Sequence, residues 1–425
     1  MNTIEFVKDL NNRFFQGELS TQFLDKLQQL PIDRPDVFAF VQRMFGFMSS
    51  AGIPAKDMSV LIGEILGTLL ARILPGAWEG RVPPITLPGR HAIIDQYIKT
   101  NQWIDSGSKS MLDIGCGFPP HTTIETTNYF PDWNITGADP SFPVYLLYDT
   151  EGNYATLDEN KSTVYFQPAI PSVENWNKLL HNAAATKDRF ENLLDELLNE
   201  SNQDSSSLPR LENNPIKTYE TEKLSFISGG IGLIDIESKD VIRCFNVLYY
   251  FNDTFFENAL KWFCENTIEG GLILIGGNWA ISTECYYNVY QKNGNQLVTR
   301  EFAFSLDCIC PFGIVAWYAN HDDDRQKAEL VKYISVIRKD KVFMGAFYAF
   351  HDAQRVKYGI CPRDKQGNYG VVDPSIDPLN LWHLVSKVLN ELNESGLNQK
   401  AVDVLNNAGL KARVNEVGHV AVEPY

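Results

Sequence analysis

Apolar residues recur at three- and four-residue spacing through the first part of the chain, from Ile4 to Phe14 and again from Val37 to Phe45. This spacing predicts amphipathic helices. Residues 58–74 are apolar nearly all round, which predicts a buried helix. We expect that helix to pack within the chain, with a homodimer interface as the alternative. Residues 1–87 are therefore predicted to form a helical N-terminal region.

From residue 110 onwards, short apolar runs alternate with helical segments. We predict strands at residues 110–114, 133–139, 224–228, 240–246 and 271–277, with a helix at 255–266 before the last of them. Alternation of this kind is typical of an α/β fold with a mainly parallel sheet. We therefore expect an α/β core.

Two segments interrupt this alternation. Residues 143–222 exceed a normal crossover: they include a predicted amphipathic helix at 173–202 and a polar loop at 201–215, and we interpret them as an insertion, with a lid as one option. Residues 279–379 begin with a predicted hairpin at an Asn293-Gly294 turn and are rich in aromatic residues. The chain then ends in a predicted helix at 381–407 and a terminal hairpin.

The first strand runs into Asp113-Ile-Gly115-Cys-Gly117, and Pro119 and Pro120 then open a helix. Glycine at 115 and 117 lets a ligand approach the backbone, and the helix N-terminus offers unpaired N–H groups. A dinucleotide site would carry a third glycine at position 120. The stretch thus favours another nucleotide-type ligand, with a ligand-free glycine turn as the alternative.

This stretch resembles motif I of the class I S-adenosylmethionine-dependent methyltransferases, with Pro119 departing from the final glycine. The resemblance extends over roughly residues 85–278 and 380–425. It implies a Rossmann-like sheet with helices on both faces and S-adenosylmethionine as the cofactor. It also implies that Asp113 helps to hold the amino acid end of the cofactor, while Gly115 and Gly117 let its body lie against the turn.

Further cofactor-binding residues follow from this resemblance. Asp139 ends the next strand, twenty-two residues after Gly117, where a carboxylate can accept the ribose hydroxyls; an Asp139-Pro140 turn without a ligand is the alternative. Gly230 and Ile231 match the adenine-contacting turn. Arg90 could meet the methionine carboxylate, or be an exposed arginine with no such role. Asn246 would lie where the methyl group leaves.

The acceptor is harder to predict than the cofactor. Tyr249, Trp279 and Tyr286 are candidate substrate-binding residues, although core packing explains such aromatic residues equally well. We divide the chain into the helical region, an S-adenosylmethionine-binding core at 88–278, an aromatic-rich mixed α/β cap at 279–379, and a C-terminal helix and strands at 380–425. The sequence does not identify a catalytic base.

Composition narrows the choice of partner. The chain has 37 lysines and arginines against 53 acids, a net charge of −16, which disfavours nucleic acid and anionic membrane surfaces. Its seven cysteines contain no C-x-x-C pair, and His321 to Asp324 fits a solvated turn better than a metal site. With no targeting or membrane-spanning pattern, we expect a cytoplasmic protein.

We therefore predict a methyltransferase that acts on a small molecule, with an aromatic or secondary-metabolite acceptor as one option. A protein carboxyl (glutamate) methyltransferase is the second possibility, because residues 240–278 also resemble that group. The third is a catalytically inactive cofactor-binding or scaffolding module, which the departure at Pro119 and the glycine in place of an acid near Gly230 would suit.

Overall fold

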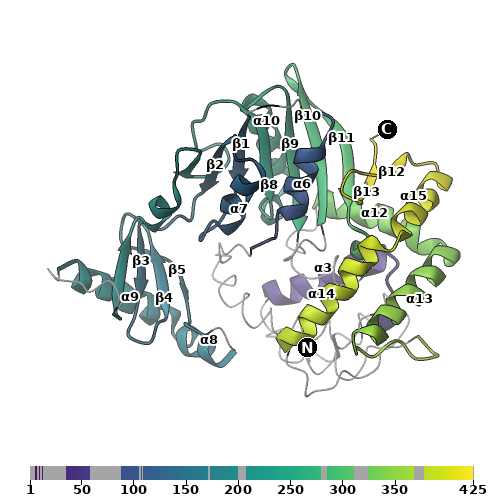
Figure 1. Cartoon of the computed structure of the whole chain (residues 1–425). Coiled ribbons are helices and arrows are strands. Elements are labelled where there is room, and N and C mark those ends of the chain that lie inside the picture. Colours follow the sequence, from purple (N-terminus) through teal and green to yellow (C-terminus); the bar gives the residue numbers. More distant parts are fainter. Residues whose placement is uncertain are drawn as a thin grey trace.

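The computed structural model describes residues 5, 6, 9, 12, 35–57, 88–104, 107, 109–170, 173–199, 207–278, 285–310, 324–367 and 378–424. Within them, a nine-stranded sheet forms the centre of the molecule (Figure 1). Its strands, in order across the sheet, are β12 (Ala412–Val414), β13 (Val420–Val422), β11 (Gln296–Phe304), β10 (Cys285–Asn293), β9 (Thr267–Asn278), β8 (Lys239–Phe245), β1 (Ser110–Ile114), β2 (Asn134–Asp139) and β7 (Leu224–Ser228). The segment from β9 to β7 is parallel. The predicted α/β class and Rossmann-like sheet are confirmed.

Helices cover both faces of the parallel strands. Helices α6 (Ala92–Thr100) and α7 (His121–Tyr129) lie on one face, and α10 (Asp253–Glu265) lies on the other. Successive residues of a strand point to opposite faces, so Met111 packs with Ile94 of α6 while Leu112 packs in the cluster that contains Phe263 of α10. Both faces of the central strand β9 are buried, and it carries the continuous apolar run at residues 272–275.

The hairpin predicted around Asn293 and Gly294 is present, but it does not lie in a separate cap. Strand β10 pairs antiparallel with β9 as well as with β11, so the hairpin extends the main sheet. The first half of β10 is buried on both faces: Tyr286 and Tyr287 lie in different hydrophobic clusters, on opposite sides of the sheet. Beyond the hairpin, β13 pairs with β11 and β12 forms the outer edge.

A helical layer packs beside this antiparallel part of the sheet. Its elements are α3 (Pro35–Ser50), η1 (Ala55–Asp57), η5 (Leu306–Ile309), α12 (Arg325–Lys339), α13 (Lys341–Lys357), α14 (Pro378–Glu394) and α15 (Leu397–Asn407). Arg338 of α12 bonds Asp57 and the carbonyl of Ile309, which ties the N-terminal region to this layer. The single helix predicted at 381–407 is two helices, because Gly396 between them has a φ of +76°. The helix predicted at 58–74 lies outside the described residues.

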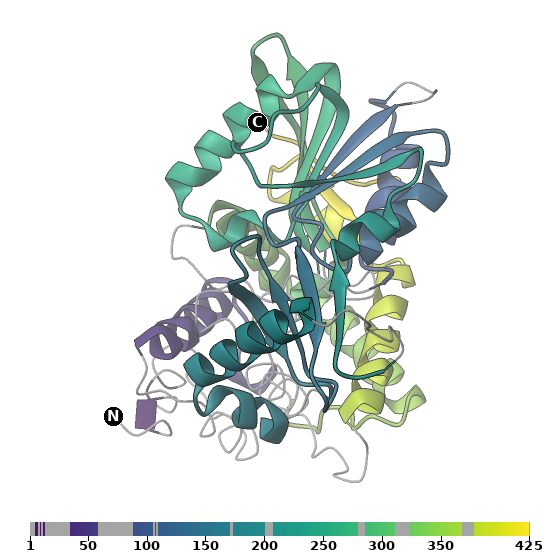
Figure 2. The same ribbon diagram turned by 90° about the vertical axis from the view of Figure 1, so that its left-hand side faces the viewer.

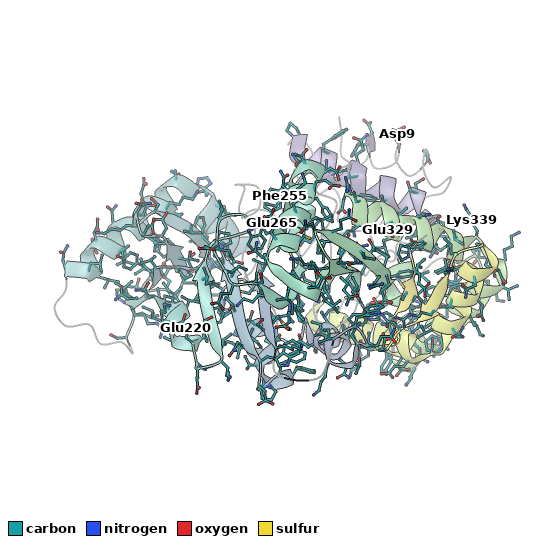
Figure 3. The ribbon with its side chains drawn as sticks, turned by 90° about the horizontal axis from the view of Figure 1, so that it is seen from above. Asp9, Glu220, Phe255, Glu265, Glu329 and Lys339 are labelled. Carbon is teal, nitrogen blue, oxygen red and sulfur yellow. The ribbon has the colours of Figure 1, made fainter. Side chains whose placement is uncertain are left out.

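The insertion after β2 is a small α/β unit with its own core. Its elements are β3 (Tyr145–Tyr148), β4 (Tyr154–Leu157), β5 (Thr163–Gln167), α8 (Val173–Leu180), α9 (Ala183–Asn199), β6 (Arg210–Asn213) and η2 (Pro215–Tyr219). The amphipathic helix predicted at 173–202 is two helices, α8 and α9, with residues 181–182 between them, and β6 occupies part of the predicted polar loop. Figure 2 views this unit from its outer side, with the two helices in front of the strands. Seen from above, Glu220 marks the side of the insertion and Lys339 the far end, in the helical layer (Figure 3).

No disulfide joins any of the seven cysteines. None of the helices in the described part of the chain is both long and apolar enough to cross a membrane.

The C-terminal hairpin carries a buried histidine that should make folding sensitive to acid. His419 is buried against the ring of Tyr287, and this burial lowers the pKa of its imidazole to about 4. In the unfolded chain a histidine titrates near pH 6.5, so below that pH the unfolded state binds a proton that the folded state excludes. The free energy of unfolding should therefore fall by about 1.4 kcal/mol per pH unit from this residue between about pH 6.5 and 4.

Urea unfolding at pH 7, 6 and 5 measures this effect. In His419→Phe, the free energy of unfolding should fall less steeply with falling pH, because about one proton fewer is taken up on unfolding. The exposed His181, between α8 and α9, provides the control, because His181→Gln should leave the slope unchanged. An unchanged slope in His419→Phe would refute the assignment.

Candidate functional site

The parallel strands β2, β1, β8 and β9 end at one edge of the sheet, the lower edge in Figure 1. The loops that follow them carry most of the predicted site residues. In open α/β sheets, ligands bind in the crevice outside the carboxyl ends of the strands. This edge is therefore the candidate site.

The turn after β1 has the backbone that the glycines predict. Gly115 and Gly117 have φ values of +75° and +70°, in the left-handed region that favours glycine. A Cβ on Gly115 would lie 2.1 Å from Cγ2 of Val247, in the loop after β8. The turn is thus closely packed on one side, and only glycine fits at position 115.

Asp139 ends β2 and binds this same turn. Its Oδ2 accepts a hydrogen bond from the N–H of Gly117 at 2.9 Å, and its Oδ1 accepts bonds from the N–H and hydroxyl of Ser141. The side chain is 7% exposed, and burial raises its pKa against these hydrogen bonds. A carboxylate has about four acceptor positions, so capacity remains for a ligand hydroxyl, and for a second one if the Ser141 hydroxyl turns away.

The predicted adenine contacts lie beside Asp139. Gly229 donates its N–H to the carbonyl of Asp139, and a Cβ on Gly230 would be 3.9 Å from the ring of Pro140. The structure therefore brings Pro140, Gly230 and Ile231 together at the ends of β2 and β7. Their contact with a cofactor remains a prediction.

Asp113 lies deeper than we expected. Arg243 of β8 binds both its carboxylate oxygens, with Nε to Oδ1 at 2.9 Å and Nη2 to Oδ2 at 2.7 Å, and Thr123 of α7 donates to Oδ2 at 2.6 Å. Asp113 is buried and Arg243 is 0% exposed. With its carboxylate engaged by three donors, Asp113 acts in our revised interpretation on the shape of the turn and not by direct contact with a ligand.

The same arginine joins a second carboxylate. Its Nη1 bonds Asp95 of α6, whose other oxygen accepts from Thr126 of α7. Burial alone would raise the pKa of Asp113, but the charge and hydrogen bonds of Arg243 outweigh it and hold that pKa below its usual value. Asp95 has one bond to the arginine, and burial raises its pKa to about 7. The cluster Asp95, Asp113, Thr123, Thr126 and Arg243, hereafter the Arg243 cluster, fixes α6 and α7 to the sheet.

A pair of asparagines links the ends of β8 and β9. Asn246, which has a φ of +60°, donates its amide to Oδ1 of Asn278 at 2.8 Å and accepts from the N–H of Asn278 at 3.0 Å. The amide of Asn278 donates in turn to the carbonyl of Arg90 at 2.6 Å. The structure thus brings the predicted residues Arg90 and Asn246 to one end of the site, through a residue that sequence reasoning missed.

The next residue along the chain, His91, was also missed. It is 4% exposed, and neither of its ring nitrogens has a hydrogen-bond partner among the described residues. Its ring centroid lies 5.5 Å from that of Phe245, the last residue of β8. Burial lowers its pKa well below the usual value, and the positive charge of Arg243 adds to this effect. The imidazole is therefore neutral at pH 7.

The predicted substrate residues are less well supported. Tyr249, in η3 (Leu248–Tyr250) after β8, bonds the hydroxyl of Tyr250 at 3.0 Å. Tyr286 is 1% exposed and lies over Gly277, its partner in the β9–β10 register, so it packs in the core. Trp279 and His321 lie outside the described residues. A role for Tyr249, Tyr286 or Trp279 in binding a substrate remains a prediction.

The chain has low similarity to solved structures of methyltransferases. No protein-family model and no curated protein matches the chain. Among solved structures, it resembles the N-methyltransferase NodS from Bradyrhizobium japonicum (14% identity, 44% of this chain and 66% of that one, TM-score 0.21). It also resembles a candidate S-adenosylmethionine-dependent methyltransferase from Methanococcus maripaludis (13% identity, 85% of this chain and 92% of that one, TM-score 0.24). A third similar structure is human N-acetylserotonin methyltransferase in complex with S-adenosylmethionine (12% identity, 62% of this chain and 55% of that one, TM-score 0.23).

The chain spans less than two thirds of the length of the NodS and N-acetylserotonin methyltransferase chains. At these identities and TM-scores, the likeness establishes neither a family nor an activity. The functional assignment therefore depends on the geometry at the carboxyl edge of the sheet.

Proposed function

We propose that this chain is an S-adenosylmethionine-dependent methyltransferase that acts on a small-molecule acceptor. The observation that carries the proposal is the glycine turn after β1, hydrogen-bonded to the carboxylate that ends β2. A glycine turn of this kind lets a ligand approach the backbone, here beside a carboxylate that can accept from sugar hydroxyls. Both are what a nucleoside ligand with an attached amino acid needs.

The other residues of the edge fit such a cofactor. Asp139 has acceptor capacity for the ribose. Pro140, which follows β2, and Gly230 and Ile231, which follow β7, are the residues we propose for contact with the adenine. At the opposite end, Nε of Arg90 is buried without a partner among the described residues, as expected of a group that meets an anion. Asn246 lies between the two ends.

S-adenosylmethionine, when bound, supplies an electrophilic methyl group. The contribution of this chain would be to hold the donor in one orientation and to exclude water, because methyl transfer requires in-line approach by the acceptor atom. The bonds between Asn246 and Asn278 would keep the loop after β8 in a fixed conformation during that approach. We assign no catalytic base.

The choice of a small molecule rests on charge and on the loops at the site. A net charge of −16 disfavours nucleic acid and acidic receptor peptides. Tyr249 and Trp279, which follow β8 and β9, are the residues we propose for contact with the acceptor. A cytoplasmic location and a possible dimer through residues 58–74 remain predictions.

Incubation with methyl-labelled S-adenosylmethionine and an extract tests the acceptor class. The extract is divided by ultrafiltration into small molecules and protein before it is added. We expect label to enter the small-molecule fraction, and its rate of entry at a limiting cofactor concentration to fall roughly 10- to 100-fold when the Gly115→Ala protein replaces the wild type. Label that enters only the protein fraction would instead support a protein methyltransferase, and no label in either would support a binding module.

A further inference from the structure

The four-stranded sheet of the insertion has two unlike faces. One face carries an apolar row that packs with α9, and its members are Leu147, Ala155 and Phe166. Successive residues of a strand point to opposite faces, so the adjacent row lies on the other face. That row, hereafter the inner row, consists of Arg210, Tyr148, Tyr154 and Gln167.

The inner row faces the part of the molecule that holds the candidate site. Strand β3 begins six residues after Asp139, so the insertion starts at the carboxyl edge of the main sheet (Figure 1). Helices α8 and α9 lie on its outer side, which turns the inner row towards the rest of the molecule (Figure 2). Tyr148 and Tyr154 pack against the same hydrophobic cluster as Phe118, the residue after Gly117. Continuous packing thus joins the inner row to the loop that follows the glycine turn.

Flat groups make up most of this surface. The ring centroids of Tyr148 and Tyr154 are 5.9 Å apart, and the guanidinium of Arg210 lies 4.1 Å from the ring centroid of Tyr148. Tyr165, on the same face of β5, has its ring centroid 6.2 Å from that of Tyr154. Tyr148, Tyr154 and Arg210 are only half-buried. Such a surface is suited to stacking with an aromatic ring.

The polar groups of the surface favour an uncharged ligand that carries a hydroxyl. Glu212 balances the charge of Arg210, since its Oε1 lies 3.2 Å from Nη2, so an anion gains no advantage there. Nε of Arg210 is buried and has no hydrogen-bond partner among the described residues, which leaves one donor for a ligand. The hydroxyls of Tyr154 and Tyr165 donate to Oε1 of Gln167 at 2.9 and 2.6 Å, which leaves their oxygens as acceptors. A hydroxyl satisfies both kinds of group, because it donates one hydrogen bond and accepts others.

We propose that the inner row binds the ring of the methyl acceptor, and that this acceptor is an uncharged aromatic compound with at least one hydroxyl group. The inference rests on the function proposed above and names the substrate class of that function. It gives the inner row a role in binding and orienting the acceptor, and none in holding the cofactor.

Two variants test the inner row. Tyr154→Leu removes a ring, and Arg210→Met removes the free donor while a side chain of similar length still covers Tyr148. With methyl-labelled S-adenosylmethionine and the small-molecule fraction of the extract at a limiting concentration, each variant should methylate roughly 3- to 30-fold more slowly than the wild type. Concentrating the fraction should restore most of the rate, because the loss lies in acceptor binding. S-adenosylhomocysteine should bind both variants within about twofold of the wild type, which also shows that they are folded.

Arg189→Met is the matched control. Like Arg210, Arg189 lies over an aromatic ring, that of Phe190 at 4.9 Å, and pairs with a carboxylate, that of Asp149 at 3.1 Å, but it belongs to α9 on the outer side. It should methylate at the wild-type rate.

The outcomes separate this inference from the proposed function. If the wild type methylates the fraction and both inner-row variants match it, the inference fails and the proposed function stands. A loss that Arg189→Met shares, or one that comes with weaker binding of S-adenosylhomocysteine, would also overturn the inference. If the wild type methylates nothing, the proposed function fails and this inference with it.

Extraction tests the substrate class. The small-molecule fraction is shaken with ethyl acetate at pH 7 before the assay. An uncharged hydroxylated aromatic compound passes into the organic phase, because a phenol titrates only near pH 10. Material recovered from that phase should therefore support methylation, and the aqueous residue should not. Acceptor activity that stays in the water would contradict the class.

Discussion

Replacing Arg243 with methionine should lower the free energy of unfolding at pH 8 by about 3–5 kcal/mol. The guanidinium is 0% exposed and neutralises Asp95 and Asp113, which are themselves buried. Methionine fills a similar volume but leaves two carboxylates without a counter-charge. Removal of one member of a buried ion cluster is costly mainly because the remaining charges stay desolvated.

The loss should be smaller at pH 5 than at pH 8. Without the arginine, burial raises the pKa of both carboxyls above their unfolded values, so the folded variant binds protons that the unfolded chain does not, and its stability falls as pH rises. Chemical unfolding at the two pH values measures this. Arg300→Met, on the partly exposed face of β11, is the control and should cost about 1 kcal/mol or less. Equal losses in the two variants would show that the Arg243 cluster does not hold the sheet and helices together.

Gly115→Ala should weaken binding of S-adenosylhomocysteine roughly 10- to 100-fold, because it strains the turn by about 1–3 kcal/mol. The new Cβ would be in a left-handed conformation and 2.1 Å from Val247. To relieve this overlap, the turn must move away from the loop after β8, which displaces the N–H of Gly117 from Asp139. Calorimetric titration gives the change in affinity.

Two variants isolate the cause. Gly270, at the start of β9, has the same φ of +75°, but a Cβ added there would have no atom within 4 Å, so Gly270→Ala should leave binding unchanged. Adding Val247→Ala to Gly115→Ala removes the overlapping methyl and should recover part of the affinity. If Gly115→Ala binds as the wild type does, the turn is not part of the cofactor site.

The parallel half of the sheet could be predicted because its strands are buried on both faces. Burial of that kind leaves a local mark, such as the apolar run of β1 ending in glycines, which needs no knowledge of distant residues. No local sequence pattern predicts where the β10–β11 hairpin packs. Its tyrosines suit a cap or a sheet equally well, and only their register against Gly276 and Gly277 of β9 decides between them.

The candidate site shows the same division. The position of Asp139 followed from one strand-to-strand spacing, and the structure places it against Gly117 as that spacing suggests. The interpretation of Asp113 missed Arg243, which is 130 residues away in the chain. A charged residue inside the apolar run of β8 was a signal that a buried counter-charge exists, but it could not say where. No sequence pattern singles out His91 and Asn278, because their contacts are with residues that are distant in the chain.

Calorimetric titration of the purified protein with S-adenosylhomocysteine is the most direct test of the central claim, that this edge of the sheet binds S-adenosylmethionine. We expect one site in the wild type and a loss of roughly 100-fold in affinity in Asp139→Ala, which removes the acceptor of the ribose hydroxyls. Asp149→Ala, which removes a similar turn-capping carboxylate in the insertion, should bind normally. No binding by the wild type, or equal binding by the wild type and Asp139→Ala, would contradict the account.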